Sequence, residues 1–81
     1  MRIRYTENFL KNYARAPAEI RMAFDKQVKF LVADLRHGSL QVKKYGGSKN
    51  IWQARVTQSW RFYFTIHGDT YYLLNILPHP K

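Results

Sequence analysis

The side chains able to do chemistry in this sequence are mostly basic. Fourteen Lys and Arg residues stand against five Asp and Glu, which gives the 81 residues a net charge of +9. Cysteine is absent from the sequence, which excludes a thiol nucleophile and a cysteine-ligated zinc site. The three histidines are scattered and no two acids are spaced as a cleft pair, so we expect no metal site, no cofactor and no two-carboxylate hydrolase. Any reaction must therefore use His, Lys, Arg or Tyr.

So large a positive charge favours a polyanionic partner, which could be nucleic acid, an acidic membrane or an acidic protein. The sequence contains neither of the glycine-rich phosphate loops of the nucleotide-binding α/β folds. It begins without the apolar run of a signal peptide and contains no apolar stretch long enough to span a membrane, so we expect a cytoplasmic protein. Its length predicts a single domain over residues 1–81.

The elements that would position the basic residues begin with one strand and two helices. Alternating polar and apolar residues predict a strand over 2–5, and Thr6 is placed to cap the helix that follows. Pro17 separates this helix from a second one, because the residue before a proline avoids the α region. Gly38 is a natural end for the second helix. The apolar stripe of this second helix, which we expect in the core, consists of Ile20, Phe24, Val28, Leu31 and Leu35.

After Gly38 the apolar residues recur at every second position, as they do in strands. This pattern predicts a strand from Leu40 to Tyr45 that ends at residues 46–48, and further strands over 52–56, 60–66 and 71–77. Gly68-Asp69 is a tight hairpin signal. The predicted fold is α+β with the order β-α-α-β-β-β-β, in which both helices pack on one face of a mostly antiparallel sheet.

The other face of this sheet is predicted to stay open, because no further helix remains to cover it. Arg61 and Tyr63 alternate with aromatic residues that must face the helices, so they turn to the open face. By the same alternation, Arg55 and Gln53 lie opposite Trp52 on their own strand. An open sheet surface with arginines and a tyrosine suits a phosphate-rich ligand.

Three segments share a pattern of basic and aromatic residues. They are Lys43–Gly46 (KKYG), Ile51–Val56 (IWQARV) and Trp60–Phe64 (WRFYF), followed by a hairpin and a last apolar strand. Together with the order of the elements, they resemble the RelE/ParE superfamily of bacterial toxin–antitoxin toxins over nearly the whole chain. The resemblance implies a RelE-like fold and a toxin that a cognate acidic antitoxin neutralises, either over the basic residues of the sheet or on the first helix.

For the nuclease branch, the resemblance implies cleavage of messenger RNA on the ribosome, without metal, by attack of a ribose 2′-hydroxyl on the adjacent phosphate. Two alternatives stay open. One is a ParE-like inhibitor of DNA gyrase without nuclease activity, and the other is a plain nucleic-acid-binding module that acts through its charge.

The resemblance also implies roles for particular residues. Arg61 matches the strand arginine of the family, and it would bind phosphate and stabilise the developing charge. His79 would transfer a proton, either as the general acid on the 5′-oxygen or as the base on the 2′-hydroxyl. The residues that we expect to bind RNA or phosphate are Lys43, Lys44, Arg55, Tyr63 and Lys81.

Overall fold

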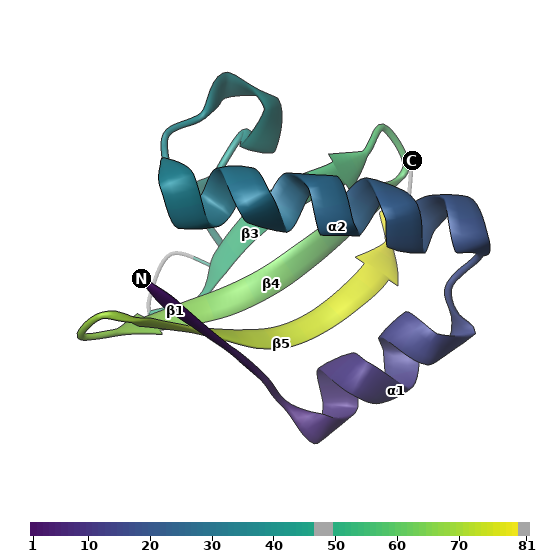
Figure 1. Cartoon of the computed structure of the whole chain (residues 1–81), viewed down its shortest axis with the longest axis horizontal. Helices are drawn as coiled ribbons and strands as arrows, with labels where there is room; N and C mark the ends of the chain where they lie inside the picture. Colours follow the sequence, from purple (N-terminus) through teal and green to yellow (C-terminus); the bar gives the residue numbers. More distant parts are fainter. Residues whose placement is uncertain (47–49, 80–81) are drawn as a thin grey trace.

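The computed structural model describes residues 1–46 and 50–79, and it has the predicted order of elements. This confirms the α+β class (Figure 1). The elements are β1 (Arg2–Tyr5), α1 (Glu7–Arg15), α2 (Ala18–Ala33), the 3-10 helix η1 (Gly38–Leu40), β2 (Lys43–Lys44), β3 (Trp52–Thr57), β4 (Trp60–His67) and β5 (Thr70–Pro78).

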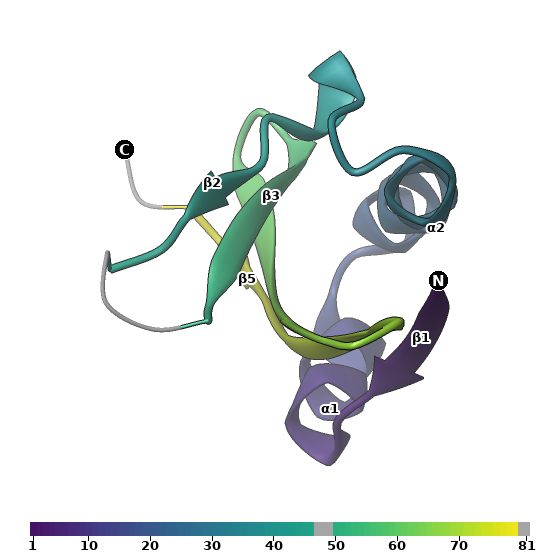
Figure 2. The same cartoon turned by 90° about the vertical axis from the view of Figure 1, so that its left-hand side faces the viewer.

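The strands form one sheet in the order β1-β5-β4-β3-β2. β1 runs parallel to β5, and the other neighbours are antiparallel, so the predicted meander of β3, β4 and β5 is confirmed. The turn between β4 and β5 contains Gly68 at a φ of +59°, a conformation that suits glycine. Figure 2 shows both helices on the same side of the sheet. Among the described residues, no helix covers the opposite side, which we call the open face.

The start of α1 follows the prediction from sequence. The Thr6 Oγ1 accepts a hydrogen bond from the Phe9 N–H at 3.2 Å, as an N-cap should. The same hydroxyl donates to the Leu73 carbonyl of β5 at 2.9 Å, so the cap also joins α1 to the sheet. The helix ends at Arg15, ahead of Pro17.

The end of α2 differs from the prediction, because the helix stops at Ala33 rather than continuing toward Gly38. Asp34 leaves the helical conformation with a φ of −160°, and its Oδ1 accepts a hydrogen bond from the Arg36 N–H at 3.0 Å. An Asp side chain that bonds the backbone two residues ahead competes with the helix for that N–H. Leu35 still packs half-buried against the core, but from the turn after the helix.

The strand predicted from Leu40 to Tyr45 is wrong at its start. Leu40 is fully buried in η1, and only β2 remains as a strand in this segment. The His37 Nδ1 accepts from the Ser39 N–H at 3.2 Å and caps η1 locally, which a period of two cannot reveal. The predicted end of the strand falls partly on residues 47–49, which lie outside the described residues.

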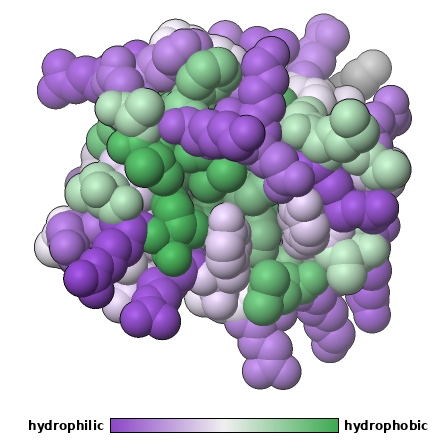
Figure 3. All heavy atoms as spheres, in the orientation of Figure 1, coloured by the Kyte–Doolittle hydropathy of each residue, from purple (hydrophilic) through white to green (hydrophobic). Residues whose placement is uncertain are grey.

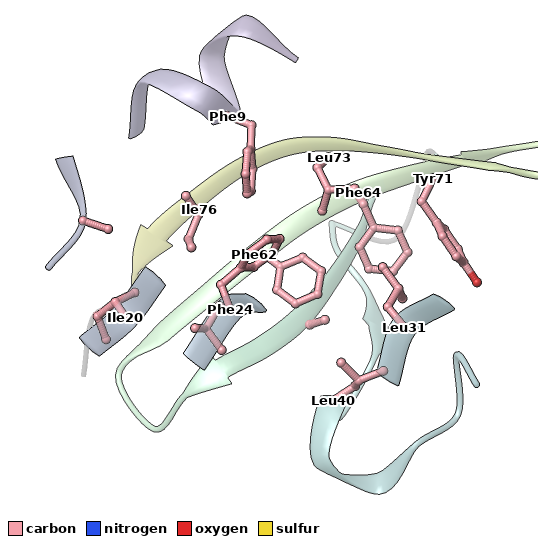
Figure 4. Close-up of a cluster of buried hydrophobic side chains, with 13 residues drawn as sticks. Phe9, Ile20, Phe24, Leu31, Leu40, Phe62, Phe64, Tyr71, Leu73 and Ile76 are labelled. Atoms are coloured by element: carbon pink, nitrogen blue, oxygen red, sulfur yellow. The ribbon is translucent and has the colours of Figure 1, made fainter. Parts of the chain in front are cut away.

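The core lies between the helices and the sheet, and its centre is aromatic (Figure 4). The ring of Phe24 in α2 lies 5.1 Å from that of Phe9 in α1 and 5.2 Å from that of Phe62 in β4, measured between centroids. Trp60 and Ile66, which also face the helices, are only partly buried. The largest fully buried side chains are Phe9, Phe24, Phe62, Phe64, Leu31, Leu40, Leu73 and Ile76.

The helix side of the molecule shows apolar side chains near its middle and hydrophilic ones around them (Figure 3). On α1, Phe9 is buried in the core, whereas Leu10 keeps 51% of its surface exposed. The Tyr13 hydroxyl donates to Asp25 Oδ1 at 2.9 Å.

Among the described residues, no helix is both long and apolar enough to cross a membrane.

β5 contains a bulge that matters for the open face. Tyr63 pairs with Asn75 and Phe64 pairs with Leu73, so Leu74 is an extra residue between two consecutive pairs. A bulge of this kind inverts the facing of all residues after it. The second half of β5 therefore presents the opposite alternation to the one that its sequence suggests.

Candidate functional site

Arg55 of β3 and Arg61 of β4 are direct cross-strand partners on the open face. The next pair in the register, Ala54 with Phe62, is fully buried on the helix face, which confirms the predicted facing of both arginines. Both arginines are half-buried. Like charges directly opposite each other repel, so this pair is suited to an anion that binds between them.

The charges around the pair do not neutralise it. The five acids of the sequence lie in α1, in α2, directly after α2 and in the turn between β4 and β5, and none lies in a strand. Within residues 1–46 and 50–79, the ion pair found is Arg2 with Asp69, at 3.9 Å. The open face is therefore electropositive and lacks an internal counterion among the residues described.

The guanidinium of Arg61 is held by the turn between β3 and β4. Its Nη1 donates to the carbonyls of Thr57 at 2.6 Å, Gln58 at 3.2 Å and Trp60 at 2.9 Å. Among the described residues, Nε and Nη2 have no protein partner. The edge of the guanidinium between these two nitrogens is a fork that matches two oxygens of a phosphate.

His79 is tied to the same turn through its backbone. Its N–H donates to the Ser59 carbonyl at 2.7 Å, directly after the end of β5. The side chain is exposed. The structure therefore brings both residues predicted to be catalytic to the one turn between β3 and β4, where Arg61 attaches by its side chain and His79 by its main chain.

The two lysines of β2 face opposite sides of the sheet. Lys43 pairs with Gln53, which in turn pairs with Tyr63, so Lys43 belongs to the open face. Lys44 pairs with Trp52, and its Nζ lies 5.5 Å from the centre of the Trp52 ring. The structure does not bring Lys44 together with the arginines. Gln53 shares their face, but it is buried rather than exposed.

Tyr63 lies next to Arg61 on the open face and contacts a second tyrosine. Its ring centroid is 5.1 Å from that of Tyr45, with 69° between the ring planes. Burial raises the pKa of Tyr63 most, and Tyr45 raises it further, whereas Arg61 lowers it. A tyrosine hydroxyl is protonated at neutral pH even without this shift, so Tyr63 can donate a hydrogen bond. Lys81, the remaining predicted residue, lies outside the described residues.

Gln27 is a supporting residue that the sequence analysis missed. It is buried in α2, and its Nε2 donates to the Arg55 carbonyl at 2.8 Å and to the Ser39 carbonyl at 3.1 Å. The Ser39 hydroxyl donates back to its Oε1 at 3.0 Å. Gln27 thereby fixes the backbone of β3 at Arg55. One signal in the sequence could have revealed it. Gln27 comes three residues after Phe24, so it lies on the same face of the helix as the apolar stripe.

A hollow on the open face lies beside Arg61, and the sequence analysis missed most of its residues. The bulge at Leu74 gave no signal in the sequence, yet it brings Asn75 and Leu77 to this face, where Leu77 pairs directly with Arg61. The hollow is lined by Tyr45, Ile51, Tyr63, Leu74, Asn75 and Leu77. We call it the tyrosine hollow.

Protein-family models and curated protein sequences give no match to this chain. Solved structures do match it. A YoeB/ParE toxin from Agrobacterium tumefaciens superposes with a TM-score of 0.81 at 16% identity, over 99% of this chain and 100% of that one. The RelE–RelB complex from Pyrococcus horikoshii gives 0.80 at 15% identity, over 99% of this chain and 96% of that one.

A RelB–RelE antitoxin–toxin complex from Methanococcus jannaschii gives a TM-score of 0.68 at 21% identity, over 93% of this chain and 88% of that one. These likenesses place the chain in a class of small α+β folds found in bacterial and archaeal toxins. The fold is that of the RelE/ParE toxins, as the sequence motifs predicted.

Proposed function

We propose that residues 1–81 form the toxin of a type II toxin–antitoxin pair, and that this toxin cleaves messenger RNA on the ribosome. The observation that carries the proposal is the pairing of Arg55 with Arg61 on an open face whose strands contain no carboxylate. The fold shared with RelE and YoeB toxins supports the same assignment.

In the reaction that we propose, the scissile phosphate lies between the two arginines. The ribose 2′-hydroxyl attacks the adjacent phosphorus and the bond to the 5′-oxygen breaks, which leaves a 2′,3′-cyclic phosphate and a 5′-hydroxyl. The free edge of the Arg61 guanidinium and the Arg55 charge stabilise the extra negative charge of the transition state. His79 transfers one of the two protons, either taken from the 2′-hydroxyl or given to the 5′-oxygen, and solvent water exchanges the other. Lys43, and Lys81 beyond the described residues, bind neighbouring phosphates.

The neutralising partner that we propose is an acidic antitoxin, because the net charge of +9 and the uncompensated open face call for negative charge. Two of the matching structures are complexes of RelE with RelB. The rate of complex formation should fall steeply with added salt, since salt screens the attraction that steers the encounter. The proposed target is translated in the cytoplasm, which is where the toxin would act.

The test is in vitro translation with the purified chain, followed by primer extension on the message and by a gyrase supercoiling assay. Cuts in ribosome-bound message that carry 2′,3′-cyclic phosphate ends support the proposal. Loss of supercoiling without cuts would instead identify a ParE-like gyrase inhibitor. RNA binding with neither effect would leave a plain binding module. Lys43→Ala removes one positive charge from the open face. Its matched control is Lys44→Ala, which removes one positive charge from the other face.

A further inference from the structure

We propose that the tyrosine hollow is a nucleobase pocket that receives the base next to the phosphate bound by Arg61. This inference rests on the proposed function and assigns a part of the substrate to residues that the mechanism does not use. The ligand class is a single unpaired RNA base, held by stacking on one side and by a hydrogen bond from Asn75 at its edge.

The position of the tyrosine hollow follows from the strand register. Leu77, which lines it, is the direct partner of Arg61, and Tyr63 lies two residues along β4 on the same face. Two residues of a strand span roughly 7 Å. A phosphate held at Arg61 therefore has its neighbouring base within reach of the hollow.

The walls of the hollow suit the flat face of a base. Tyr45 and Tyr63 meet edge to face, with the edge of one ring against the face of the other. Tyr45 is 51% exposed and Leu77 is 37% exposed, so large apolar side chains face solvent beside a cationic site. Aromatic rings beside arginines are the usual arrangement for single-stranded nucleic acid, since every base has a face that can stack.

Asn75 gives the hollow one directed polar group. Its Oδ1 accepts from the Ile76 N–H at 3.0 Å and from the Asn12 Nδ2 at 2.5 Å. A backbone N–H can only donate, which fixes the orientation of the amide and leaves its Nδ2 without a partner among the described residues. The Asn75 Nδ2 can therefore donate to a base that presents an acceptor, such as a ring nitrogen or a carbonyl oxygen.

The experiment measures binding of a non-cleavable 2′-O-methyl RNA and of the same RNA with one abasic position beside the target phosphate. Wild-type protein should bind the abasic RNA roughly 5- to 100-fold more weakly, as expected for the loss of one stacked base. In Tyr45→Ala the two RNAs should bind alike. Leu10→Ala is the matched control, because Leu10 is also exposed but lies on α1, and it should keep the wild-type difference.

Equal binding of the two RNAs by wild-type protein would overturn the pocket, and cleavage of message in the same preparation would leave the proposed function standing. If the wild-type protein binds the abasic RNA more weakly but cuts no message, the pocket stands and the proposed function is wrong. If Tyr45→Ala and Leu77→Ala weaken binding to the antitoxin and leave the abasic difference intact, the hollow belongs to a protein partner and the proposal is wrong.

Discussion

Arg55 and Arg61 face each other directly across β3 and β4, with their side chains on the open face. Each is held by a different part of the fold. Gln27 bonds the backbone of Arg55, and the carbonyls of the β3–β4 turn bond the guanidinium of Arg61. The backbone of Arg55 and the guanidinium of Arg61 are thus in place before an anion binds, and the two like charges repel each other in the free protein.

Removing the charge of Arg55 should therefore stabilise the free protein. We expect Arg55→Gln to raise the free energy of unfolding by up to about 1 kcal/mol, since it removes a like-charge pair. Inorganic phosphate should raise the Tm of the wild type more than that of the variant, because a ligand stabilises the state that binds it. Thermal unfolding with and without phosphate checks this. An equal response to phosphate in both proteins would remove Arg55 from the anion site.

Arg61→Ala should affect both activity and stability. Loss of a preorganised charge should slow cleavage about 10²–10³-fold. Loss of its hydrogen bonds to the turn should lower the free energy of unfolding by about 1–3 kcal/mol. Single-turnover cleavage, measured at a temperature where the variant is folded, separates the two effects. Arg61→Lys keeps the charge but loses the fork, and full activity in it would contradict bidentate phosphate binding.

His79→Ala should slow cleavage about 10²–10⁴-fold, the range for a positioned general acid or base. The fold should persist, because the bond from residue 79 to the Ser59 carbonyl uses only the backbone. His67→Ala is the control, since His67 is also exposed but lies at the opposite end of β4 from Arg61. Unchanged activity in His79→Ala would leave a lysine as the proton carrier.

Lys43 and Lys44 provide a direct test of the register of β2. Lys43→Ala should weaken RNA binding and reduce the slope of affinity against salt by about one charge. Lys44→Ala should leave both unchanged, because its side chain lies over Trp52 on the other face. Equal effects of the two substitutions on binding would mean that RNA does not use the open face.

The stability of the fold should fall above pH 10. The pKa values of four tyrosines are raised above 10.0, and burial of the hydroxyl is the largest cause in each. The four are Tyr5, Tyr13, Tyr63 and Tyr71. As the pH rises, the unfolded chain therefore loses its phenolic protons before the folded one does. The stability present below pH 10 is lost as the pH rises through the pKa values of the folded protein. Denaturant unfolding at stepped pH checks the direction, and Tyr63→Phe should flatten the fall. A rise in stability over this range would contradict these shifts.

The sequence predicted the meander, both helices and the face of Arg61, because the alternation in β4 is regular and its aromatic residues had to be buried. It failed where local hydrogen bonds decide the backbone. Asp34 ends α2 early by bonding the Arg36 N–H, and His37 caps η1 where a strand was expected. Both bonds use side chains whose local partners a hydrophobic period does not describe.

The candidate site was predictable only in part, for a related reason. The facing of Arg55 and Arg61 follows from alternation, but the facing of Asn75 and Leu77 depends on the bulge at Leu74. A single extra residue inverts every later position of the strand, and nothing in the apolar run of β5 marks where it lies. The tyrosine hollow is consequently visible only in the folded chain.

The parallel pairing of β1 with β5 has a consequence for the order of synthesis. Thr6 bonds the Leu73 carbonyl from 67 positions away, and β1 is made before β5, so β1 cannot pair until β5 has been made. Arg61 and Leu77 likewise come together only when β5 docks. Under the proposed function, the surroundings of Arg61 therefore stay incomplete until β5 has been made and has docked.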